Sequence, residues 1–459
     1  MFSNVPCTRT TGSGCAAVGL QGRFAPGGGG LAAEAVAAVA RTIRTVAMVV
    51  RMPCVVPGTC SPARYTTVAL PAAATILDRI IASGMTSPFK YGPIALDEAF
   101  TNRAAEVAEL SADALNGQDV VIFAPRRYGK TSLVHRVAQQ LTRRRALVAE
   151  VNLWFTPTKE KLASRLAREI ADILGLAGKA KEAARTFAGL RIVPTITIDP
   201  NDGSFSFSFA AGHTAQDVDD TLEWLFRMLA ETAASRKRQV VLILDEFQEI
   251  AEIDPNLTKL LRSVFQEQPE VSHIYLGSKR HLMERIFSDE NEPFWRSAKR
   301  MELGPIAPDE FRPFIVAGFA EHGRGIEDGV VDRVLQITGG HPYATQELCY
   351  FLWAETPNRR TARAEQLESA LTKLLRSEHS HFSDLWDRAT ANQRLLLTAL
   401  AAEPGRPFSE PYRARHSLRG ASTTQKAVDA LAKQELVARS GGEVRIVEPF
   451  YGEWVRRNV

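Results

Sequence analysis

The sequence predicts an α/β fold: a P-loop core with a parallel sheet, then a helical lid and a C-terminal winged helix-turn-helix. Two observations predict the sheet. A strand, loop and helix pattern spans residues 119–140, and an apolar run at 240–244 ends in two carboxylates. A third observation predicts the last part, because three helical patterns after residue 387 precede a β-hairpin pattern.

The loop at 124–131 reads Ala-Pro-Arg-Arg-Tyr-Gly-Lys-Thr and joins the apolar run 119–123 to the amphipathic run 132–140. A helix start offers unpaired N–H groups and a positive dipole end, which together hold a polyphosphate. Glycine lets the backbone approach the phosphates, lysine reaches the β- and γ-phosphates, and the threonine hydroxyl ligates magnesium. The residues expected at the phosphates are Ala124, Pro125, Arg126, Arg127, Tyr128, Gly129, Lys130, Thr131 and Ser132.

Ala124 departs from the usual phosphate-loop pattern, GxxxxGK[ST], which begins with glycine. Alanine is also small, and only a required positive φ would exclude it. The alternative is a chance Gly-Lys-Thr at a helix start. A second motif is therefore needed to decide whether this loop binds phosphate.

That motif is the apolar run Val240-Val-Leu-Ile-Leu244 followed by Asp245 and Glu246. Branched residues without a break fit a strand buried on both faces of a parallel sheet, and ligands bind at its carboxyl end. We expect Asp245 to hold magnesium, directly or through water, and Glu246 to act as the general base. A buried strand with surface carboxylates is the alternative for this motif alone. Together the motifs predict an ATPase or GTPase, and the lack of an Asn-Lys-x-Asp string favours ATP.

Two further positions fit roles in hydrolysis. The strand at 272–276 ends in Gly277-Ser278, where a polar side chain would hydrogen-bond the γ-phosphate, so Ser278 is the candidate sensor. An ordinary turn serine is the alternative. The basic run at 294–300 supplies Arg296 as first choice, and Arg300 as second, for an arginine finger. The alternative there is a solvated basic run.

Composition separates residues 1–84 from the rest. The chain has 459 residues and a net charge of +4, yet this segment holds seven arginines against one glutamate and one aspartate. It is also rich in alanine and glycine and holds four of the five cysteines, without metal-ligand spacing. We expect a disordered extension, or a stretch added upstream of the functional start. The remainder is close to neutral, so the charge does not indicate nucleic-acid binding.

The expected domains are a core at 85–305, a helical lid at 306–383 and a winged helix at 387–459. Within the core, alternating residues on both sides of an Asn-Asp-Gly turn predict a β-hairpin insertion at about 191–210. Its three phenylalanines, Phe205, Phe207 and Phe209, share one face, which we expect to pack on the protein.

The lid and winged helix each contain one informative feature. In the lid, Thr338-Gly-Gly-His-Pro-Tyr343 stops one helix and starts the next. In the winged helix, the third helix is expected to begin with Ser422 or Thr423 as its N-cap. Twelve basic against eight acidic residues from Asp387 onward are a modest bias, so DNA and a protein partner both stay open.

From Met85 to the C-terminus the chain resembles the archaeal-type ATPase family of STAND P-loop NTPases, relatives of the AAA+ origin-recognition ATPases. The matching strings are SPFKYGP, EAFTNRAAEV, APRRYGKTSLV, VVLILDEFQEI, YLGSKRHLMERIF with FWR, GGHPYATQ and EPFYGEWVR. The resemblance implies an ATP-driven switch in which slow hydrolysis changes the angle between core, lid and winged helix. It also implies that Asn102, Arg103, His341 and Pro342 border the base.

The preferred hypothesis is an ATP-binding and hydrolysing, magnesium-dependent switch whose winged helix contacts DNA or a protein partner. One rival is a nucleotide-sensing scaffold that does not hydrolyse ATP. Another is a DNA-binding regulator in which ATP only sets assembly. We expect a cytoplasmic protein without a membrane span, able to form a nucleotide-dependent homo-oligomer.

Overall fold

The computed structural model describes residues 87–92, 103–176, 179–198, 205–209, 212–321 and 323–459. The expected extension at 1–84 therefore lies outside the described residues, as do Asn102 and the hairpin turn at 199–204. Every described residue belongs to one compact unit of the chain, residues 72–459. No described helix is long and apolar enough to span a bilayer.

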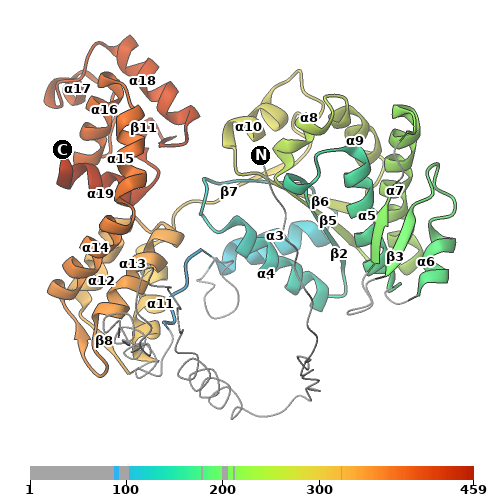
Figure 1. The fold of residues 1–459 in the computed structure, drawn as a ribbon, viewed down its shortest axis with the longest axis horizontal. Coiled ribbons are helices and arrows are strands. Elements are labelled where there is room, and N and C mark those ends of the chain that lie inside the picture. The colour runs from blue at the N-terminus through green and yellow to red at the C-terminus, as the bar shows by residue number, and fades with distance from the viewer. Residues whose placement is uncertain (1–86, 93–102, 177–178, 199–204, 210–211, 322) are drawn as a thin grey trace, which may run out of the picture. The chain divides into compact units, whose positions relative to one another are not determined.

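A five-stranded parallel sheet in the order β2-β5-β6-β1-β7 carries the motifs (Figure 1). Its strands are β1 (Val120–Phe123), β2 (Leu147–Asn152), β5 (Val240–Asp245), β6 (Val271–Leu276) and β7 (Lys299–Glu302). Each of β1, β5 and β6 is buried along its whole length, as the apolar runs of β1 and β5 predict. The sequence did not predict β7, because three of its four residues are exposed and polar, as suits an edge strand.

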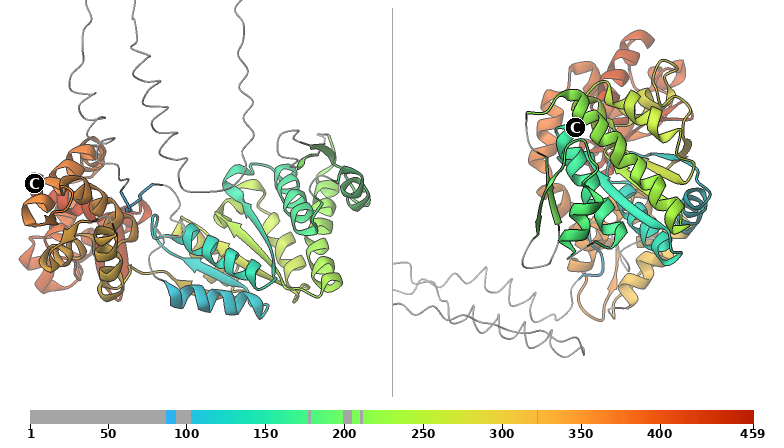
Figure 2. Two further views of the ribbon diagram at one scale, coloured as in Figure 1. Left: turned by 90° about the horizontal axis from the view of Figure 1, so that it is seen from below. Right: turned by 90° about the vertical axis from the view of Figure 1, so that its right-hand side faces the viewer.

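Helices cover both faces of the sheet (Figure 2). On one face, α3 (Ala104–Leu115) and α4 (Lys130–Arg143) share an apolar cluster with Val120 and Ile122. On the other, a larger cluster joins Val121 and Phe123 to the remaining core helices. Alternate residues of β1 thus serve opposite layers. The helices of the second layer are α5 (Lys159–Leu174), α7 (Ala215–Arg236), α9 (Leu257–Phe265) and α10 (Arg280–Ser288).

Short helical turns complete the core next to the ends of two strands. They are η2 (Leu153–Phe155) after β2, and η3 (Phe247–Glu249) with α8 (Ile250–Ile253) after β5. These turns lie where the chain leaves the carboxyl end of each strand, which is the edge expected to bind ligand.

The predicted insertion is an antiparallel hairpin of β3 (Thr195–Ile198) and β4 (Phe205–Ser208). Phe205 and Phe207 are buried in the larger core cluster and Phe209 packs against it, as expected. An additional helix, α6 (Ala180–Thr186), precedes the hairpin and was not predicted, since its seven residues bury only Ala183.

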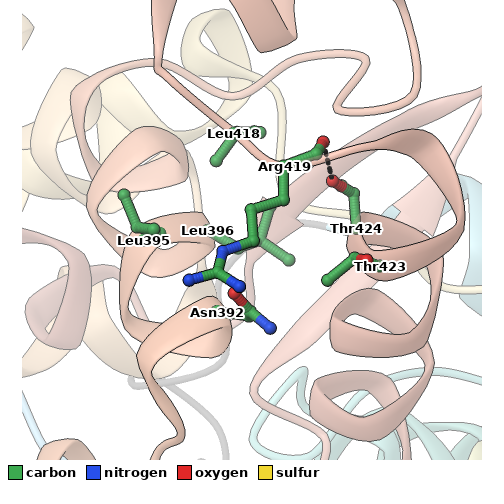
Figure 3. Close-up of a pocket in the computed structure, with 7 residues that line it drawn as sticks. All are labelled: Asn392, Leu395, Leu396, Leu418, Arg419, Thr423 and Thr424. Atoms are coloured by element: carbon green, nitrogen blue, oxygen red, sulfur yellow. Dashed lines mark hydrogen bonds between the residues drawn. The ribbon is translucent and has the colours of Figure 1, made fainter.

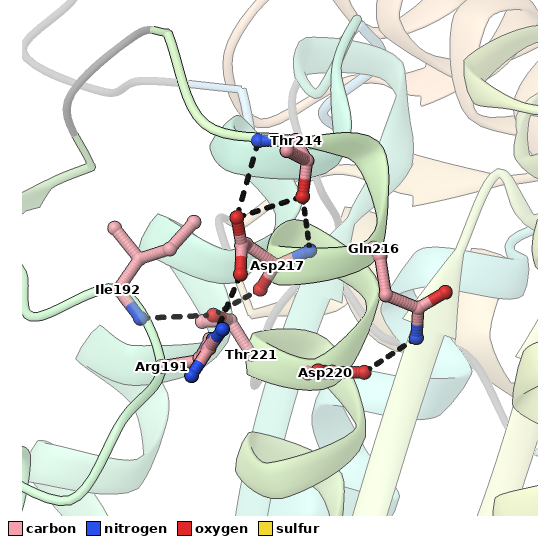
Figure 4. Close-up of polar contacts among 7 residues, drawn as sticks. All are labelled: Arg191, Ile192, Thr214, Gln216, Asp217, Asp220 and Thr221. Carbon is pink, nitrogen blue, oxygen red and sulfur yellow. Dashed lines mark hydrogen bonds and ion pairs between the residues drawn. The ribbon is translucent and has the colours of Figure 1, made fainter.

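A polar cluster attaches the start of the insertion to α7 (Figure 4). Arg191 Nε donates to Asp217 Oδ1 at 2.8 Å, and the Ile192 N–H donates to Thr221 Oγ1 at 3.3 Å. The same Asp217 forms a capping box with Thr214, the N-cap of α7. Because of these contacts, the pKa of Asp217 falls to about 2.

The lid is helical, as expected, and consists of α11 (Pro308–Ala320), α12 (Asp328–Thr338), α13 (Pro342–Glu355) and α14 (Ala364–Ser377). Two features of this region were not predicted. The two-residue strands β8 (Gly325–Ile326) and β9 (Thr361–Ala362) pair in parallel, and α15 (His379–Arg388) follows α14. Two residues per strand are too few to leave a periodic signal.

The winged helix consists of α16 (Ala391–Ala402), α17 (Glu410–Arg415), α18 (Ala421–Lys433) and the antiparallel pair β10 (Val437–Ser440) and β11 (Glu443–Ile446). The chain ends in α19 (Pro449–Asn458), which buries four large side chains and was not predicted. Residues of the lid, the winged helix and α19 share one apolar cluster.

The predicted N-cap of the third helix was wrong. The N-cap of α18 is Gly420, without a side-chain cap, so Ser422 and Thr423 lie inside the first turn. The buried Thr424 hydroxyl donates to the Arg419 carbonyl at 3.1 Å and anchors this turn (Figure 3). The cavity between α16 and α18 beside it measures about 10 Å³, which admits one water at most.

Candidate active site

The phosphate loop lies between the end of β1 and the start of α4. Gly129, the N-cap of α4, has φ 81°, a conformation that glycine adopts without strain. Ala124 is not among the described residues with positive φ, so glycine is not required there. The backbone therefore accommodates the one departure from the usual pattern.

Lys130 lies buried at the start of α4, with its ammonium held by the loop itself. Its Nζ donates to the carbonyls of Ala124 at 2.9 Å and Pro125 at 3.0 Å. Burial lowers its pKa to about 8, against the opposing charges of Glu246 and Asp245. The lysine is thus close enough to interact with both carboxylates of the Walker B motif, Asp245 and Glu246.

Asp245 ends β5 as a buried carboxylate. Its Oδ2 accepts from Asn152 Nδ2 at 3.0 Å, and its Oδ1 accepts from the Glu246 N–H at 2.9 Å. Burial, reinforced by the charge of Glu246, raises its pKa. A divalent cation would relieve this penalty, so the donor set fits magnesium.

Glu246 follows with φ 53°, a left-handed conformation rare for this residue type. Three groups donate to its Oε2: Ser278 Oγ at 2.7 Å, the Ser278 N–H at 3.2 Å and Gln248 Nε2 at 2.6 Å. Ser278 thus lies beside the expected base, and its hydroxyl contacts that carboxylate. A strained backbone held by several bonds is common at functional sites.

The structure does not bring Arg296 to the loop or to the Walker B residues. It lies exposed in the connection between α10 and β7, with its guanidinium 5.1 Å from the Trp295 ring. Arg300 lies in β7 and donates to Ser288 Oγ at 2.8 Å. No described contact joins either arginine to Lys130, Asp245 or Glu246.

Arg103 is buried and holds the phosphate loop by its backbone. Its Nη2 donates to the carbonyls of Tyr128 at 3.3 Å and Gly304 at 2.8 Å, and its Nη1 contacts Glu106. The guanidinium expected to border a base is therefore engaged by main-chain oxygens.

The lid turn reaches the loop through His341, the N-cap of α13 beside Pro342. The His341 ring meets the Tyr128 ring edge to face, with centroids 4.6 Å apart. Burial, reinforced by Arg127, lowers the pKa of His341 to about 3, so its ring is neutral. The turn itself needs glycine at 340, because a Cβ there would lie 2.2 Å from the Ile306 carbonyl oxygen.

Arg127, at φ 63° in the loop, contacts both C-terminal parts of the chain. Its guanidinium lies 4.4 Å from the centroid of the Tyr343 ring in α13. Its Nη1 lies 3.6 Å from Oε2 of Glu448, the N-cap of α19. One phosphate-loop side chain therefore touches the lid and the segment that closes the winged helix.

Three glutamates gather near this arginine: Glu347, Glu378 and Glu448. Burial, with the charges of Glu448 and Glu378, raises the pKa of Glu347 to about 8, while Arg127 opposes the rise. Burial also raises the pKa of Glu448, whose Oε1 has no hydrogen-bond partner among the described residues. Arg127 is the cation that this cluster depends on.

Sequence reasoning missed Asn152, Gln248, Tyr343 and Glu448. Asn152 had a usable signal, since it ends the strand next to β5 in register with Asp245. Gln248 lies two residues after the base, and a 3₁₀ turn there brings its amide back to Glu246. Tyr343 and Glu448 had no signal, because only the tertiary fold brings them to residue 127.

A parallel sheet with this strand order, a phosphate loop after β1 and carboxylates after β5 define a P-loop ATPase. A family model described as "ATPase domain predominantly from Archaea" matches residues 100–348, more than half of the chain. The chain belongs to this family. A second model, described as a probable winged helix domain, matches residues 380–457.

Solved structures are similar at low identity. The Walker-type ATPase of Pyrococcus abyssi has a TM-score of 0.55 and 15% identity, covering 80% of this chain and 99% of that one. The Aeropyrum pernix ORC2 protein, in ADPNP-ADP complexes, has a TM-score of 0.44 and 16% identity, with coverages of 81% and 96%. These likenesses concern the fold alone. A comparison with curated proteins finds no match.

We expect Glu347→Gln to remove part of the pH dependence of stability. The fold raises the pKa of this carboxyl from 4.5 to about 8, so its stabilising contribution is full below 4.5 and is lost as pH rises toward 8. At pH 8 the variant should be more stable than the wild type by about 1 to 2 kcal/mol. Thermal unfolding from pH 5 to 8 measures this, and an unchanged slope would contradict the assignment.

Proposed function

We propose that the protein is a magnesium-dependent ATPase in which the state of the nucleotide sets the contact between phosphate loop, lid and winged helix. The observation that carries this is Arg127, which touches Tyr343 of the lid and Glu448 at the start of α19. A nucleotide at the loop would change the partners of the same side chain. An ATPase without such coupling would not need a loop arginine in this position.

The phosphates would bind the N–H groups at the start of α4 and the ammonium of Lys130. To reach them, Lys130 exchanges the carbonyls of Ala124 and Pro125 for phosphate oxygens, which are stronger partners because they carry charge. Thr131 and Asp245 would hold magnesium, which supplies neutralisation of the β- and γ-phosphate charge. Among the described residues no group of three His, Cys, Asp or Glu is arranged to hold a metal ion, and magnesium bound with phosphates needs none.

Glu246 would take the proton of the attacking water. Its Oε2 accepts from both Ser278 and Gln248 in the present conformation. As γ-phosphate arrives, the Ser278 hydroxyl would turn to it and leave Glu246 with fewer donors and greater basicity. The role of Ser278 as sensor and that of Glu246 as base would then be linked by one hydrogen bond.

The remaining site residues have more peripheral roles. We propose that His341 and Pro342 border the base from the lid, next to Tyr128. Arg103 would hold the loop through its hydrogen bond to the Tyr128 carbonyl, and Asn102 is the residue before it in the chain. Arg296 is exposed and makes no described contact with its own phosphate loop. We propose that it acts as an arginine finger for a neighbouring copy in a homo-oligomer.

For the winged helix we propose a protein partner. The exposed part of α18 would enter a DNA groove in the usual docking. Its centre holds Asp429, which accepts from Gln425 and is paired with Arg439 of β10. An acidic side chain there repels phosphates, and the pairing takes an arginine of the wing away from them.

The active-site variants separate this proposal from a non-hydrolysing scaffold. Lys130→Ala should abolish ATP binding, because the charge-assisted contacts to the phosphates are lost. Glu246→Gln should bind ATP normally and hydrolyse it about 10² to 10⁴ times more slowly. Steady-state phosphate release and filter binding measure both. Equal turnover in Glu246→Gln and wild type would remove that residue from catalysis.

The coupling is tested by a thermodynamic cycle. If Glu448 competes with phosphate for Arg127, Glu448→Gln should tighten ATP binding about three- to tenfold, which corresponds to roughly 0.7 to 1.4 kcal/mol. Arg127→Ala should weaken it and cancel the effect of Glu448→Gln in the double variant. Glu443→Gln, an exposed carboxylate of β11, is the matched control. Independent, additive effects would count against the coupling.

The partner proposal predicts weak DNA binding. A mobility shift with a 30-base-pair duplex should show no complex that strengthens markedly as salt is lowered, because few phosphates are contacted. Charge reversal by Asp429→Lys should increase the affinity. Tight, strongly salt-dependent binding by the wild type would instead establish a DNA-contacting winged helix.

A further inference from the structure

A cavity of about 350 Å³ lies where the lid meets the winged helix and α19. Residues of α12, α16, β11 and α19 line it, and Tyr128 of the phosphate loop forms one wall. A volume of this size is within the range of small-molecule sites. Helix α18, the element expected to contact DNA, contributes no lining residue.

The charge of the lining has one sign. Arg333, Arg445 and Arg456 come from three different elements, and no aspartate or glutamate is among the described residues that line the cavity. Arg333 contacts Gln336, and Arg456 is paired with Glu453. The Arg445 guanidinium has no hydrogen-bond or ion-pair partner in the described parts of the chain, which leaves its donors available.

A buried donor faces the same space. His341 lines the cavity while being only 2% exposed. Its Nδ1 accepts from the Ala344 N–H at 3.2 Å, so the neutral ring carries its proton on Nε2. No described residue accepts from this Nε2–H. The His341 ring therefore adds a neutral donor to this wall of the cavity.

The rest of the wall is apolar. Leu400, Ile446 and Pro449 line the cavity together with small residues, including Gly452. An inorganic anion would use the arginines and leave this surface without a partner. A small organic molecule with one anionic group and an apolar body would use both.

We propose that this cavity binds a small organic anion, a phosphate or carboxylate group on an apolar body, at a site that borders the phosphate loop at Tyr128 but does not include Lys130. The anionic group would lie at Arg445, and the body against Leu400 and Ile446. Because Tyr128 lines the cavity and also belongs to the phosphate loop, binding of the ligand would depend on the conformation of the loop. The proposal goes beyond the proposed ATPase, because its binding does not need Lys130.

Isothermal titration of the full chain with phenyl phosphate tests the site. The Lys130→Ala variant is the background, because it removes phosphate binding at the loop. We expect one molecule bound per chain with the same affinity as in wild type, weaker binding of inorganic phosphate, and none of phenol. Arg445→Ala should weaken binding at least tenfold, since a charge-assisted pair is lost. Arg376→Ala, an exposed arginine of α14 outside the cavity, should change nothing.

Several results would overturn the proposal. Loss of phenyl phosphate binding in Lys130→Ala would locate it at the phosphate loop, and one-for-one displacement by ADP from wild type would make the cavity part of the nucleotide site. Unchanged affinity in Arg445→Ala would exclude the cavity. If the wild type does not bind phenyl phosphate and Arg445→Ala weakens binding of duplex DNA, Arg445 is a DNA contact. If Arg445→Ala loses its circular dichroism signature, Arg445→Gln replaces it and must show the same loss.

Discussion

The Arg127 guanidinium contacts the Tyr343 ring and the Glu448 carboxylate, and so joins the phosphate loop to the lid and to the start of α19. The lid and winged helix share a single apolar cluster. In the proposed switch, a change of partner at this arginine would therefore act on the lid and the winged helix together. The left-handed φ of Arg127 is a local strain that the fold tolerates where this contact is made.

Electrostatics explains why this contact can be exchanged. Glu347 and Glu448 are carboxyls that burial keeps at raised pKa, and Arg127 is the cation that opposes the rise at both. A phosphate would offer the same guanidinium more negative charge at the loop. In the proposed switch, moving Arg127 to phosphate would leave the carboxyls less compensated and would favour a different arrangement of α13 and α19. The free energy of nucleotide binding and the stability of the C-terminal contact would then be linked.

The predictable part of the molecule is the part with local signals. The buried runs of β1, β5 and β6, the Gly129 cap and the helices of the lid follow from apolar periodicity and turn chemistry. Edge strand β7 did not, because three of its four residues are polar, and helix α19 was also not predicted. The hydrogen bonds that Glu246 accepts from Ser278 and Gln248 depend on a 3₁₀ turn. The ion pair between Arg127 and Glu448 joins residues 321 positions apart. No sequence period encodes such a contact.

The most direct measurement is the distance between the core and the winged helix in each nucleotide state. Spin labels at exposed Lys259 of α9 and Lys426 of α18 allow it by double electron–electron resonance. We expect different distance distributions with a non-hydrolysable ATP analogue and with ADP, and no response to either in Lys130→Ala. The same distribution in every nucleotide state of the wild type would contradict a nucleotide-driven switch.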